Sequence, residues 1–468
     1  MNERRVVSLF SGAGGLDWGF KESGYSIIFA NDILEPAMLT YSKNFGLKLI
    51  RCSKEFCEAQ EGSVLLGDIA FVNFNELAKT DVDLVLGGPP CQDFSIVRGP
   101  AWDRKGIEVK RGRLYAHFIR ALATIQPKAF LFENVPGLVT ANKGLAYKVI
   151  IEDFSRLNVR WDEIKNMIGN KSSGETAEGY EIIFSDVLDF SQFGAPQKRE
   201  RLIIIGIRKD LIKSLHEAWR AQGIFLRALK KSAGLFIKYP LTTIEVFEGR
   251  RLDELDDAYK KVMKRWEGVW LEVNTEKAWK WKSEVWDKLT FTIIQDYLAT
   301  NDVKAFSKEE LEEALQQHEE VLKEMGYYKV PASSLKLVDG TNDIPDEDSA
   351  VVERMKRIPF DENHEFVRGT KWEVEGRGIS LVYRRLHPLK PAYTVVAYGG
   401  GGTHGYHYER DRATLTLRER ARLHTFPDTF LFCGSKAQIR AQIGEAVPPL
   451  VAKRLAQALT EVLTELEK

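Results

Sequence analysis

The chain has 468 residues, enough for two domains or one domain with a large insertion, and its 44% apolar and 29% charged residues are ordinary for a globular protein. Lys plus Arg and Asp plus Glu number 67 each, so the net charge does not indicate a nucleic-acid partner. No segment approaches the roughly 20 consecutive apolar residues of a membrane span, and no signal-peptide pattern opens the chain.

Short apolar runs alternate with amphipathic, helix-length segments through the first 207 residues. The predicted strands lie at 6–10, 26–30, 63–66, 84–86, 129–132 and 202–207. Helical segments lie between them, as at 35–44, 114–125 and 145–157. Strands separated by helices predict an α/β fold with a doubly wound, mostly parallel sheet.

The composition changes after Arg208. Residues 211–322 are rich in Lys, Glu and Trp at helical spacing, and from Leu381 the chain is rich in Gly, His and Arg before a closing amphipathic helix at 449–467. The simplest account is a middle insertion between two parts of one α/β domain. We expect a larger domain of residues 1–208 plus 440–468 and a smaller domain of residues 209–439.

The neutral total hides an uneven distribution of charge. Residues 98–128 hold eight basic and two acidic side chains, residues 384–424 hold eight and three, and residues 309–365 hold six and sixteen. This pattern predicts two basic segments along a phosphate groove, with the acidic stretch facing away. The alternative is that charged helix faces are simply spread unevenly.

The segment VVSLFSGAGGLDWGF at 6–20 leads a predicted strand into a turn with Gly12, Gly14 and Gly15. Glycines let the backbone turn sharply and let a ligand approach it closely. A nicotinamide-binding turn would have another glycine where Asp17 stands. A purely steric role for these glycines is the alternative.

Two carboxylates follow the next predicted strands. Asp32 lies 20 residues after Gly12, where an acidic side chain can bind the ribose of an adenosine-bearing cofactor. Asp68 follows the third strand at the same edge of the sheet, where open α/β sheets bind ligands. A helix N-cap is the alternative for either residue.

The segment LVLGGPPCQDFS at 84–95 ends a strand in Gly-Gly-Pro-Pro and then presents Cys91. Prolines fix the backbone, so the thiol has a defined direction. Most lone cysteines are small buried hydrophobes, but this one follows a rigid turn at the proposed cofactor edge. The basic run from Arg98 can favour the thiolate, which is the nucleophilic form.

Two further segments deliver charged side chains. AFLFENVPGL places Glu133 at the end of a strand, where a carboxyl group tuned by burial can act as a general acid. In QKRERLIIIG, Gln197, Arg199 and Arg201 alternate with the period of a strand, which predicts that all three project from one face. The alternative is an exposed strand edge.

In their order along the chain, these segments resemble the motifs of the DNA cytosine-5 methyltransferase family. FSGAGG resembles its cofactor motif, PPCQ its nucleophile motif, ENV its base-protonating motif, and Gln-x-Arg-x-Arg its arginine motif. Residues 385–395 with 410–430 resemble the motif that supports target recognition, and 443–459 resembles the closing motif. The resemblance covers residues 6–207 and 381–460.

The resemblance implies the Rossmann-like fold of S-adenosylmethionine-dependent methyltransferases and methyl transfer to carbon 5 of a flipped-out cytosine in double-stranded DNA. Cys91 would add to carbon 6, while Glu133, assisted by Arg199 or Arg201, acts on ring nitrogen 3. The implied cofactor contacts are Phe10, Gly12, Gly14, Gly15, Leu16, Asp32, Ile33, Asp68, Ile69, Pro90, Leu114, Glu445 and Val447. The implied DNA contacts are Gln92, Ser95, Arg98 and Gln197.

The closing motif departs from the family pattern, because Glu445 follows Gly444 where asparagine is common. A carboxylate accepts hydrogen bonds but cannot donate them as an amide does. Val447 is therefore the firmer of the two implied cofactor contacts in this motif.

Residues 209–439 stand where the family places its target-recognition region. Its tryptophans could stack on bases, but we favour the core of a small helical subdomain. These tryptophans are Trp266, Trp270, Trp279, Trp281 and Trp286.

We expect no metal. His404 and His407 lack a third ligand, which favours loop residues that face DNA, and Cys52 and Cys57 are too isolated for a zinc site. Four cysteines in so long a chain make no disulfide framework, which predicts a reducing cytoplasm.

Three alternatives stay open. A tRNA cytosine-5 methyltransferase would carry the same catalytic motifs. A nicotinamide oxidoreductase would leave PPCQ and ENV without a role, and a non-enzymatic DNA-binding protein would be expected to have lost Cys91 or Glu133. Family analogy favours a monomeric, cytoplasmic and nucleoid-associated enzyme that protects DNA against a cognate restriction endonuclease.

Overall fold

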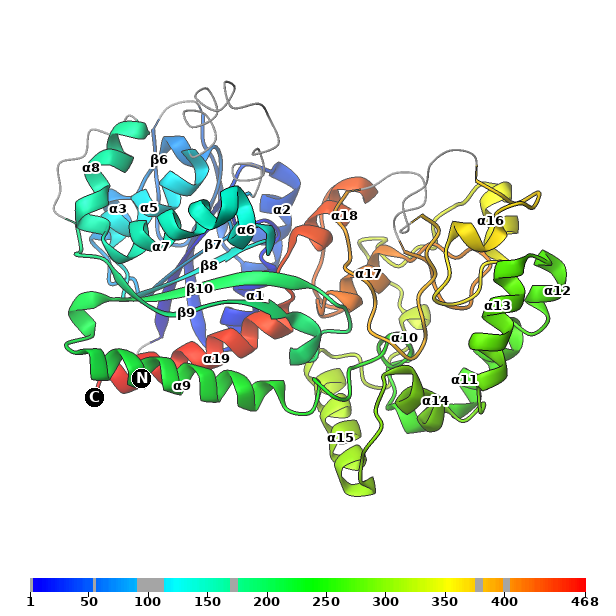
Figure 1. Ribbon diagram of the computed structural model, residues 1–468. Helices are drawn as coiled ribbons and strands as arrows, with labels where there is room; N and C mark the ends of the chain where they lie inside the picture. Colours follow the sequence, from blue (N-terminus) through cyan, green and yellow to red (C-terminus); the bar gives the residue numbers. More distant parts are fainter. Residues whose placement is uncertain (1–2, 54–55, 91–112, 169–175, 375–381, 399–404) are drawn as a thin grey trace. The chain divides into compact units, whose positions relative to one another are not determined.

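The computed structural model describes residues 3–53, 56–90, 113–168, 176–374, 382–398 and 405–468 (Figure 1). The chain forms two compact units. Unit 1 consists of Met1–Asp189, Glu200–Ser232 and Val451–Lys468, and unit 2 of Phe190–Arg199 and Ala233–Leu450. Compared with the predicted domains, unit 1 also includes residues 209–232, and unit 2 includes residues 190–199 and 440–450. The division of function between domains stays a prediction.

An eight-stranded sheet organises unit 1, with the strand order β3-β5-β2-β1-β7-β8-β10-β9. Its strands are β1 (Arg4–Leu9), β2 (Tyr25–Asp32), β3 (Lys48–Arg51), β5 (Ser63–Leu66), β7 (Leu84–Gly87), β8 (Ala129–Asn134), β9 (Tyr180–Asp189) and β10 (Glu200–Arg208). The strands from β3 to β8 in this order pair in parallel, while β10 runs antiparallel to both β8 and β9. The predicted α/β fold with a mixed, mostly parallel sheet is confirmed.

Helices cover both faces of this sheet (Figure 1). They are α1 (Gly15–Glu22), α2 (Glu35–Phe45), α3 (Asn75–Ala78), α5 (Arg113–Ile125), α6 (Gly137–Thr140), α7 (Leu145–Ser155), α8 (Leu157–Met167), α9 (Leu215–Ala233) and α19 (Pro449–Leu466). On one face, Phe118 of α5 and Phe154 of α7 pack against Phe130 and Phe132 of β8. Because these rings are fully buried, they form the centre of the core of unit 1.

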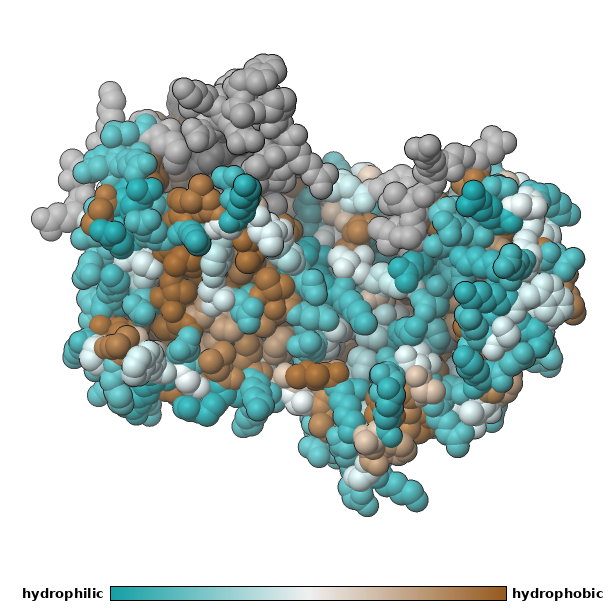
Figure 2. Space-filling model, viewed as in Figure 1, coloured by the Kyte–Doolittle hydropathy of each residue, from teal (hydrophilic) through white to brown (hydrophobic). Residues whose placement is uncertain are grey.

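Unit 2 is mainly helical. Its α-helices are α10 (Thr243–Glu248), α11 (Asp256–Arg265), α12 (Val269–Val273), α13 (Glu276–Glu284), α14 (Ile293–Thr300), α15 (Lys308–Glu324), α16 (Ser349–Met355), α17 (Leu417–Leu423) and α18 (Lys436–Glu445). Trp270, Trp281 and Trp286 cluster with ring centroids 5.3–6.4 Å apart, and Trp266 is fully buried. The visible surface over α13 is mostly hydrophilic (Figure 2). The predicted tryptophan core is confirmed, except that Trp279 is 43% exposed.

The predicted phosphate groove is wrong for four arginines of the second basic segment, Arg385, Arg418, Arg420 and Arg422, which are buried in unit 2. Their guanidinium groups donate mainly to backbone carbonyls. Arg385 donates to Ile358 O, Arg418 to Phe430 O and Arg422 to Val330 O, at 2.6–2.9 Å. These arginines therefore hold the chain of unit 2 together.

His407 is also buried, so the expectation that it faces DNA is wrong. Burial, with the nearby charges of Arg410 and Arg385, holds its pKa well below the ordinary value. His404 lies outside the described residues.

Cys52 and Cys57 form a disulfide, although the sequence predicts reduced cysteines. The reason lies in the strand arrangement, since Cys52 follows β3, Cys57 begins the short strand β4 (Cys57–Glu58), and their α carbons lie 5.8 Å apart. β4 pairs in parallel with β6 (Val72–Asn73) to form a separate two-stranded sheet.

Candidate active site

The glycine-rich turn after β1 has a strained, open backbone. Phe10 has φ 55°, which is uncommon for a residue with a side chain, and Gly12 and Gly14 also have positive φ. A β carbon on Gly14 would lie 2.6 Å from the ring of Phe45 and 2.9 Å from that of Tyr41, so helix α2 requires a glycine there. No described atom lies within 4 Å of a β carbon built on Gly12. The turn therefore leaves space on its Gly12 side, as a bound ligand requires.

Asp32 fixes this turn from the end of β2. Its Oδ2 accepts a hydrogen bond from the Gly12 N–H and its Oδ1 one from the Leu34 N–H, both at 2.9 Å. Burial raises the pKa of Asp32, against the opposing effect of these N–H groups. Each carboxylate oxygen has a second lone pair, so Asp32 can still accept a ribose hydroxyl.

Asp68 caps the short 3₁₀ helix η1 (Ile69–Phe71), because its Oδ1 accepts from the Ala70 N–H at 2.9 Å. The capping alternative thus describes its local role, and its other oxygen can accept a further hydrogen bond. Ile33 is 62% exposed beside Asp32, whereas Ile69 is buried. An exposed apolar side chain at this edge suits contact with a flat adenine ring.

The remaining predicted cofactor residues of unit 1 differ in exposure. Gly15 and Leu16 are buried at the start of α1, while Leu114 is half-buried on α5. Pro90 is exposed. The open turn, the Asp32 carboxylate and the exposed Ile33 together fit an adenosine-bearing cofactor.

Glu133 lies at the end of β8 and forms an ion pair with Arg201 near the start of β10. Arg201 Nε is 3.0 Å from Glu133 Oε1, and the two side chains are 17% and 14% exposed. A β carbon on Gly88 would lie 2.7 Å from Glu133 Oε2, so only glycine permits this approach of the carboxylate to the end of β7. The pair is sheltered yet reachable, as a group that exchanges a proton with a substrate must be.

Asn134, to which the sequence assigns no role, holds the turn that leads to Cys91. Its side chain is buried and its Nδ2 donates to Pro89 O at 3.0 Å. The sequence feature that could have indicated this role is the position of Asn134 directly after Glu133, at the end of a predicted strand. Cys91 itself lies outside the described residues, as do the predicted DNA contacts Gln92, Ser95 and Arg98.

The predicted common strand face of Gln197, Arg199 and Arg201 is wrong, because β10 begins only at Glu200. Residues before it are tethered within unit 2, where Lys198 N donates to Ala392 O at 2.9 Å and Ala392 N to Pro196 O at 2.8 Å. The alternating pattern therefore spans two differently folded segments.

Gln197 and Arg199 are both buried in unit 2. Gln197 accepts from Val395 N at 3.1 Å and donates to Leu423 O at 2.8 Å. Arg199 Nη2 donates to Gly444 O at 2.9 Å and to Ala446 O at 3.1 Å. This geometry gives both side chains structural roles and offers no support for their predicted contacts with DNA and the base.

Arg199 thus holds the backbone of the closing motif. In that motif Glu445 is exposed and Val447 is buried. Gly444 cannot be replaced without strain, because a β carbon there would lie 2.3 Å from Ala397 N. The predicted cofactor contacts of Glu445 and Val447 stay predictions.

Among the described residues, no helix is long and apolar enough to cross a membrane. The described part of the chain also contains no group of three or more His, Cys, Asp or Glu side chains that could hold a metal ion.

Comparisons with known proteins agree on one family. The family of C-5 cytosine-specific DNA methylases matches residues 4–461. The DNA (cytosine-5-)-methyltransferase M.ApeKI of Aeropyrum pernix is 65% identical, over 99% of this chain and 99% of that protein. The type II methyltransferase M.NgoFVII of Neisseria gonorrhoeae is 29% identical, over 99% of this chain and 88% of that protein. A solved E. coli structure described as a prophage-encoded DNA modification methyltransferase shares the fold, with a TM-score of 0.54 and 20% identity over 99% of this chain and 100% of that one.

Proposed function

This chain belongs to the C-5 cytosine-specific DNA methylase family, and from that premise we propose that it transfers a methyl group from S-adenosylmethionine to carbon 5 of a flipped-out cytosine in duplex DNA. The observation that carries the proposal is the Glu133–Arg201 ion pair against Gly88, at the end of the strand that leads to Cys91. Addition to a pyrimidine ring requires a nucleophile and a sheltered carboxyl group, and the sequence offers Cys91 and Glu133 for these two roles.

The cofactor site of the proposal is the open turn of Phe10–Gly15 with Asp32 and Asp68. Asp32 would accept the ribose hydroxyls, Asp68 the adenine amine, and Ile33 would cover the adenine ring. When bound, S-adenosylmethionine supplies an electrophilic methyl group to carbon 5 of the base.

The protein groups act on the base as follows. Cys91 forms a bond from its sulfur to carbon 6 of the flipped-out ring, and Glu133 gives a proton to nitrogen 3, so that carbon 5 becomes nucleophilic. Arg201 keeps the Glu133 carboxyl group in place through its 3.0 Å contact. After methylation, a water molecule takes the proton of carbon 5, whose electron pair forms the C5–C6 double bond as the Cys91 sulfur leaves carbon 6 as a thiolate. Glu133 takes back the proton of nitrogen 3, which restores the aromatic ring.

The proposal includes a specific recognition sequence and a protective role against a cognate restriction endonuclease, with the chain acting as a monomer. The recognition sequence and the protective role are supported by the similarity along almost the whole chain to a protein named as a type II methyltransferase.

The test is transfer of tritiated methyl from S-adenosylmethionine to mixed duplex DNA, with wild type, Cys91→Ser and a matched Cys433→Ser control. Cys433 is the described cysteine outside the Cys52–Cys57 disulfide. We expect label at carbon 5 of cytosine with the wild type and with Cys433→Ser, and none with Cys91→Ser. Label in bulk tRNA but not in DNA would overturn the substrate, and full activity of Cys91→Ser would overturn the nucleophile.

A further inference from the structure

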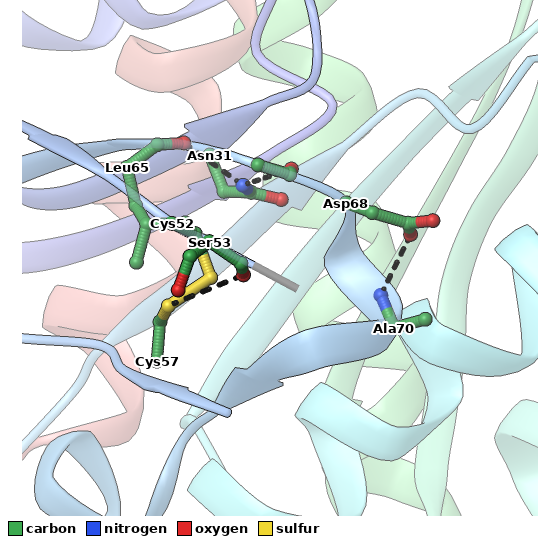
Figure 3. Close-up of a disulfide and its surroundings, with 8 residues drawn as sticks. Asn31, Cys52, Ser53, Cys57, Leu65, Asp68 and Ala70 are labelled. Carbon is green, nitrogen blue, oxygen red and sulfur yellow. Dashed lines mark hydrogen bonds between the residues drawn. A yellow bond between two sulfur atoms is a disulfide. The ribbon is translucent and has the colours of Figure 1, made fainter. Parts of the chain in front are cut away.

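The Cys52–Cys57 disulfide joins two sheets at the cofactor edge of unit 1 (Figure 3). Cys52 directly follows β3, the edge strand of the eight-stranded sheet, and its N–H donates to Leu66 O at 2.8 Å. Cys57 begins β4 and is paired with Val72 of β6 in the two-stranded sheet. The covalent bond therefore connects two sheets that share no hydrogen-bonded strand pair.

The turn that carries Asp68 runs between the same two sheets. It starts after Leu66, the last residue of β5, which is paired with Arg51 of β3. It ends at Val72, the first residue of β6, which is paired with Cys57 of β4. Both ends of the Asp68 turn are thus hydrogen-bonded to strands that the disulfide ties together.

Gly67 links the disulfide to Asp32 as well. A β carbon on Gly67 would lie 2.5 Å from Cys52 Cβ, so the half-cystine packs directly against this residue. The Gly67 N–H donates to Asp32 O at 3.0 Å, and Gly67 O accepts from Asn31 Nδ2 at 3.0 Å. Cys52 therefore holds Gly67 in position. Gly67 in turn contacts the backbone of Asp32 and directly precedes Asp68, the two carboxylates proposed to bind the cofactor.

We propose that the Cys52–Cys57 disulfide is a positioning element of the S-adenosylmethionine site, which holds the Asp68 turn and, through Gly67, Asp32. The inference rests on the proposed function, because it takes these carboxylates as cofactor contacts. When the disulfide is reduced, the Asp68 turn loses this restraint, and the cofactor must order the turn as it binds. The entropy cost of ordering about one backbone residue corresponds to a rise of about tenfold in the Kd for S-adenosylmethionine. The chemistry at Cys91 and Glu133 follows binding, so kcat stays unchanged.

The test compares the full-length wild type purified without reductant, the same protein treated with dithiothreitol, the Cys52→Ser/Cys57→Ser variant and the Cys433→Ser control. Dithiothreitol supplies two electrons and two protons, so the disulfide becomes two thiols and the reagent closes to its cyclic disulfide. Thiol titration measures the number of thiols per chain and so reports whether the disulfide is present. Calorimetry gives the Kd for S-adenosylmethionine, and methyl transfer to DNA gives kcat and KM.

We expect a rise of about tenfold in Kd and KM for both the reduced wild type and the double variant, at unchanged kcat. Dithiothreitol should not change the double variant further, and Cys433→Ser should behave as wild type. An unchanged Kd in the reduced wild type, a fall in kcat alone, or free Cys52 and Cys57 in the untreated protein would overturn the inference. Should the double variant not fold, the reduced wild type decides.

Asp32→Asn and Asp68→Asn separate this inference from the proposed function. If both variants bind S-adenosylmethionine weakly while reduction leaves the Kd of the wild type unchanged, the role of the disulfide is overturned and the proposed cofactor site is not. Wild-type affinity of both variants overturns the proposed cofactor site itself, and the inference with it.

Discussion

Arg199 and Arg201 stand two residues apart in one motif, but they belong to different units and have different partners. Arg199, in the tethered segment of unit 2, is buried and donates to the carbonyls of Gly444 and Ala446. Arg201, in β10 of unit 1, faces the partly exposed carboxylate of Glu133. The difference teaches that the acceptor decides the role of a guanidinium group. Backbone carbonyls make it a structural clamp, whereas a carboxylate that can change its proton makes it part of a reacting site.

The largest expected effect is on methyl transfer and comes from changing Glu133, the partner of Arg201. Glu133→Gln removes the exchangeable proton at nearly constant shape, so we expect kcat/KM for methyl transfer to fall about 10²- to 10⁴-fold, with unchanged thermal stability. Glu200→Gln is the matched control, because Glu200 is the exposed neighbour of Arg201. Near-wild-type turnover by Glu133→Gln would remove Glu133 from the chemistry.

Replacing Arg199 should lower the free energy of unfolding. Arg199→Met keeps a long side chain but removes the donor to Gly444 O, whereas Ala446 O still lies 2.7 Å from His424 Nε2. Leaving the Gly444 carbonyl without this donor should cost about 1–3 kcal/mol in the free energy of unfolding. Urea unfolding followed by tryptophan fluorescence measures this loss. Turnover per folded molecule should be retained. If turnover falls while stability does not, Arg199 acts on the base after all.

Arg201→Met should do the reverse. Loss of one charge-assisted hydrogen bond to Glu133 predicts a fall in kcat of about 10- to 100-fold, with little change in unfolding, because Arg201 is partly exposed. Steady-state kinetics beside the same urea experiment tests both halves of the statement. Equal effects of Arg199→Met and Arg201→Met on stability would abolish the distinction between the two arginines.

The smallest expected effect concerns a buried pair of unit 2. His318 Nε2 donates to Tyr239 O and Nδ1 to Glu245 Oε1, both at 2.9 Å, which requires a protonated ring. Burial opposes the charge, but Glu245 and the Tyr239 carbonyl outweigh it and raise the pKa of His318. A raised folded-state pKa gives stability that is complete below the unfolded pKa of about 6.5 and is lost as pH rises through the folded value.

We therefore expect the melting temperature to fall by a few degrees as pH rises above neutrality, and His318→Gln to reduce this pH dependence. His216→Gln is the matched control, since His216 is exposed. Calorimetric scans over this pH range measure the effect. The same pH dependence in His318→Gln as in the wild type would show that the pair does not titrate.

The sequence predicts the sheet and the residues at its carboxyl edge for a physical reason, while their roles stay predictions. Apolar runs locate buried strands, and parallel strands bring their carboxyl ends to one edge, so the positions of Asp32, Asp68 and Glu133 follow from their places after strands. β3 and β9 do not stand out, because β3 is a short edge strand and β9 mixes polar with apolar residues.

The arginines could not be placed from the sequence. Charge normally indicates exposure, but Arg385 and Arg422 are buried because carbonyls from distant segments surround them. Gln197 and Arg199 alternate as a strand would, and only the distant tether to Ala392 removes them from β10. The disulfide likewise depends on the pairing of β4 with β6, which no local pattern reports.

Gly88 has a practical consequence for the use of this protein as a reagent. A β carbon at position 88 would lie 2.7 Å from Glu133 Oε2, so the methyl group of Gly88→Ala would move the carboxylate, which is the end of a flexible side chain, out of its present position. Such a variant would keep every charged and polar side chain of the wild type. Under the proposed function, we expect this variant to lose methyl transfer and to retain binding to DNA.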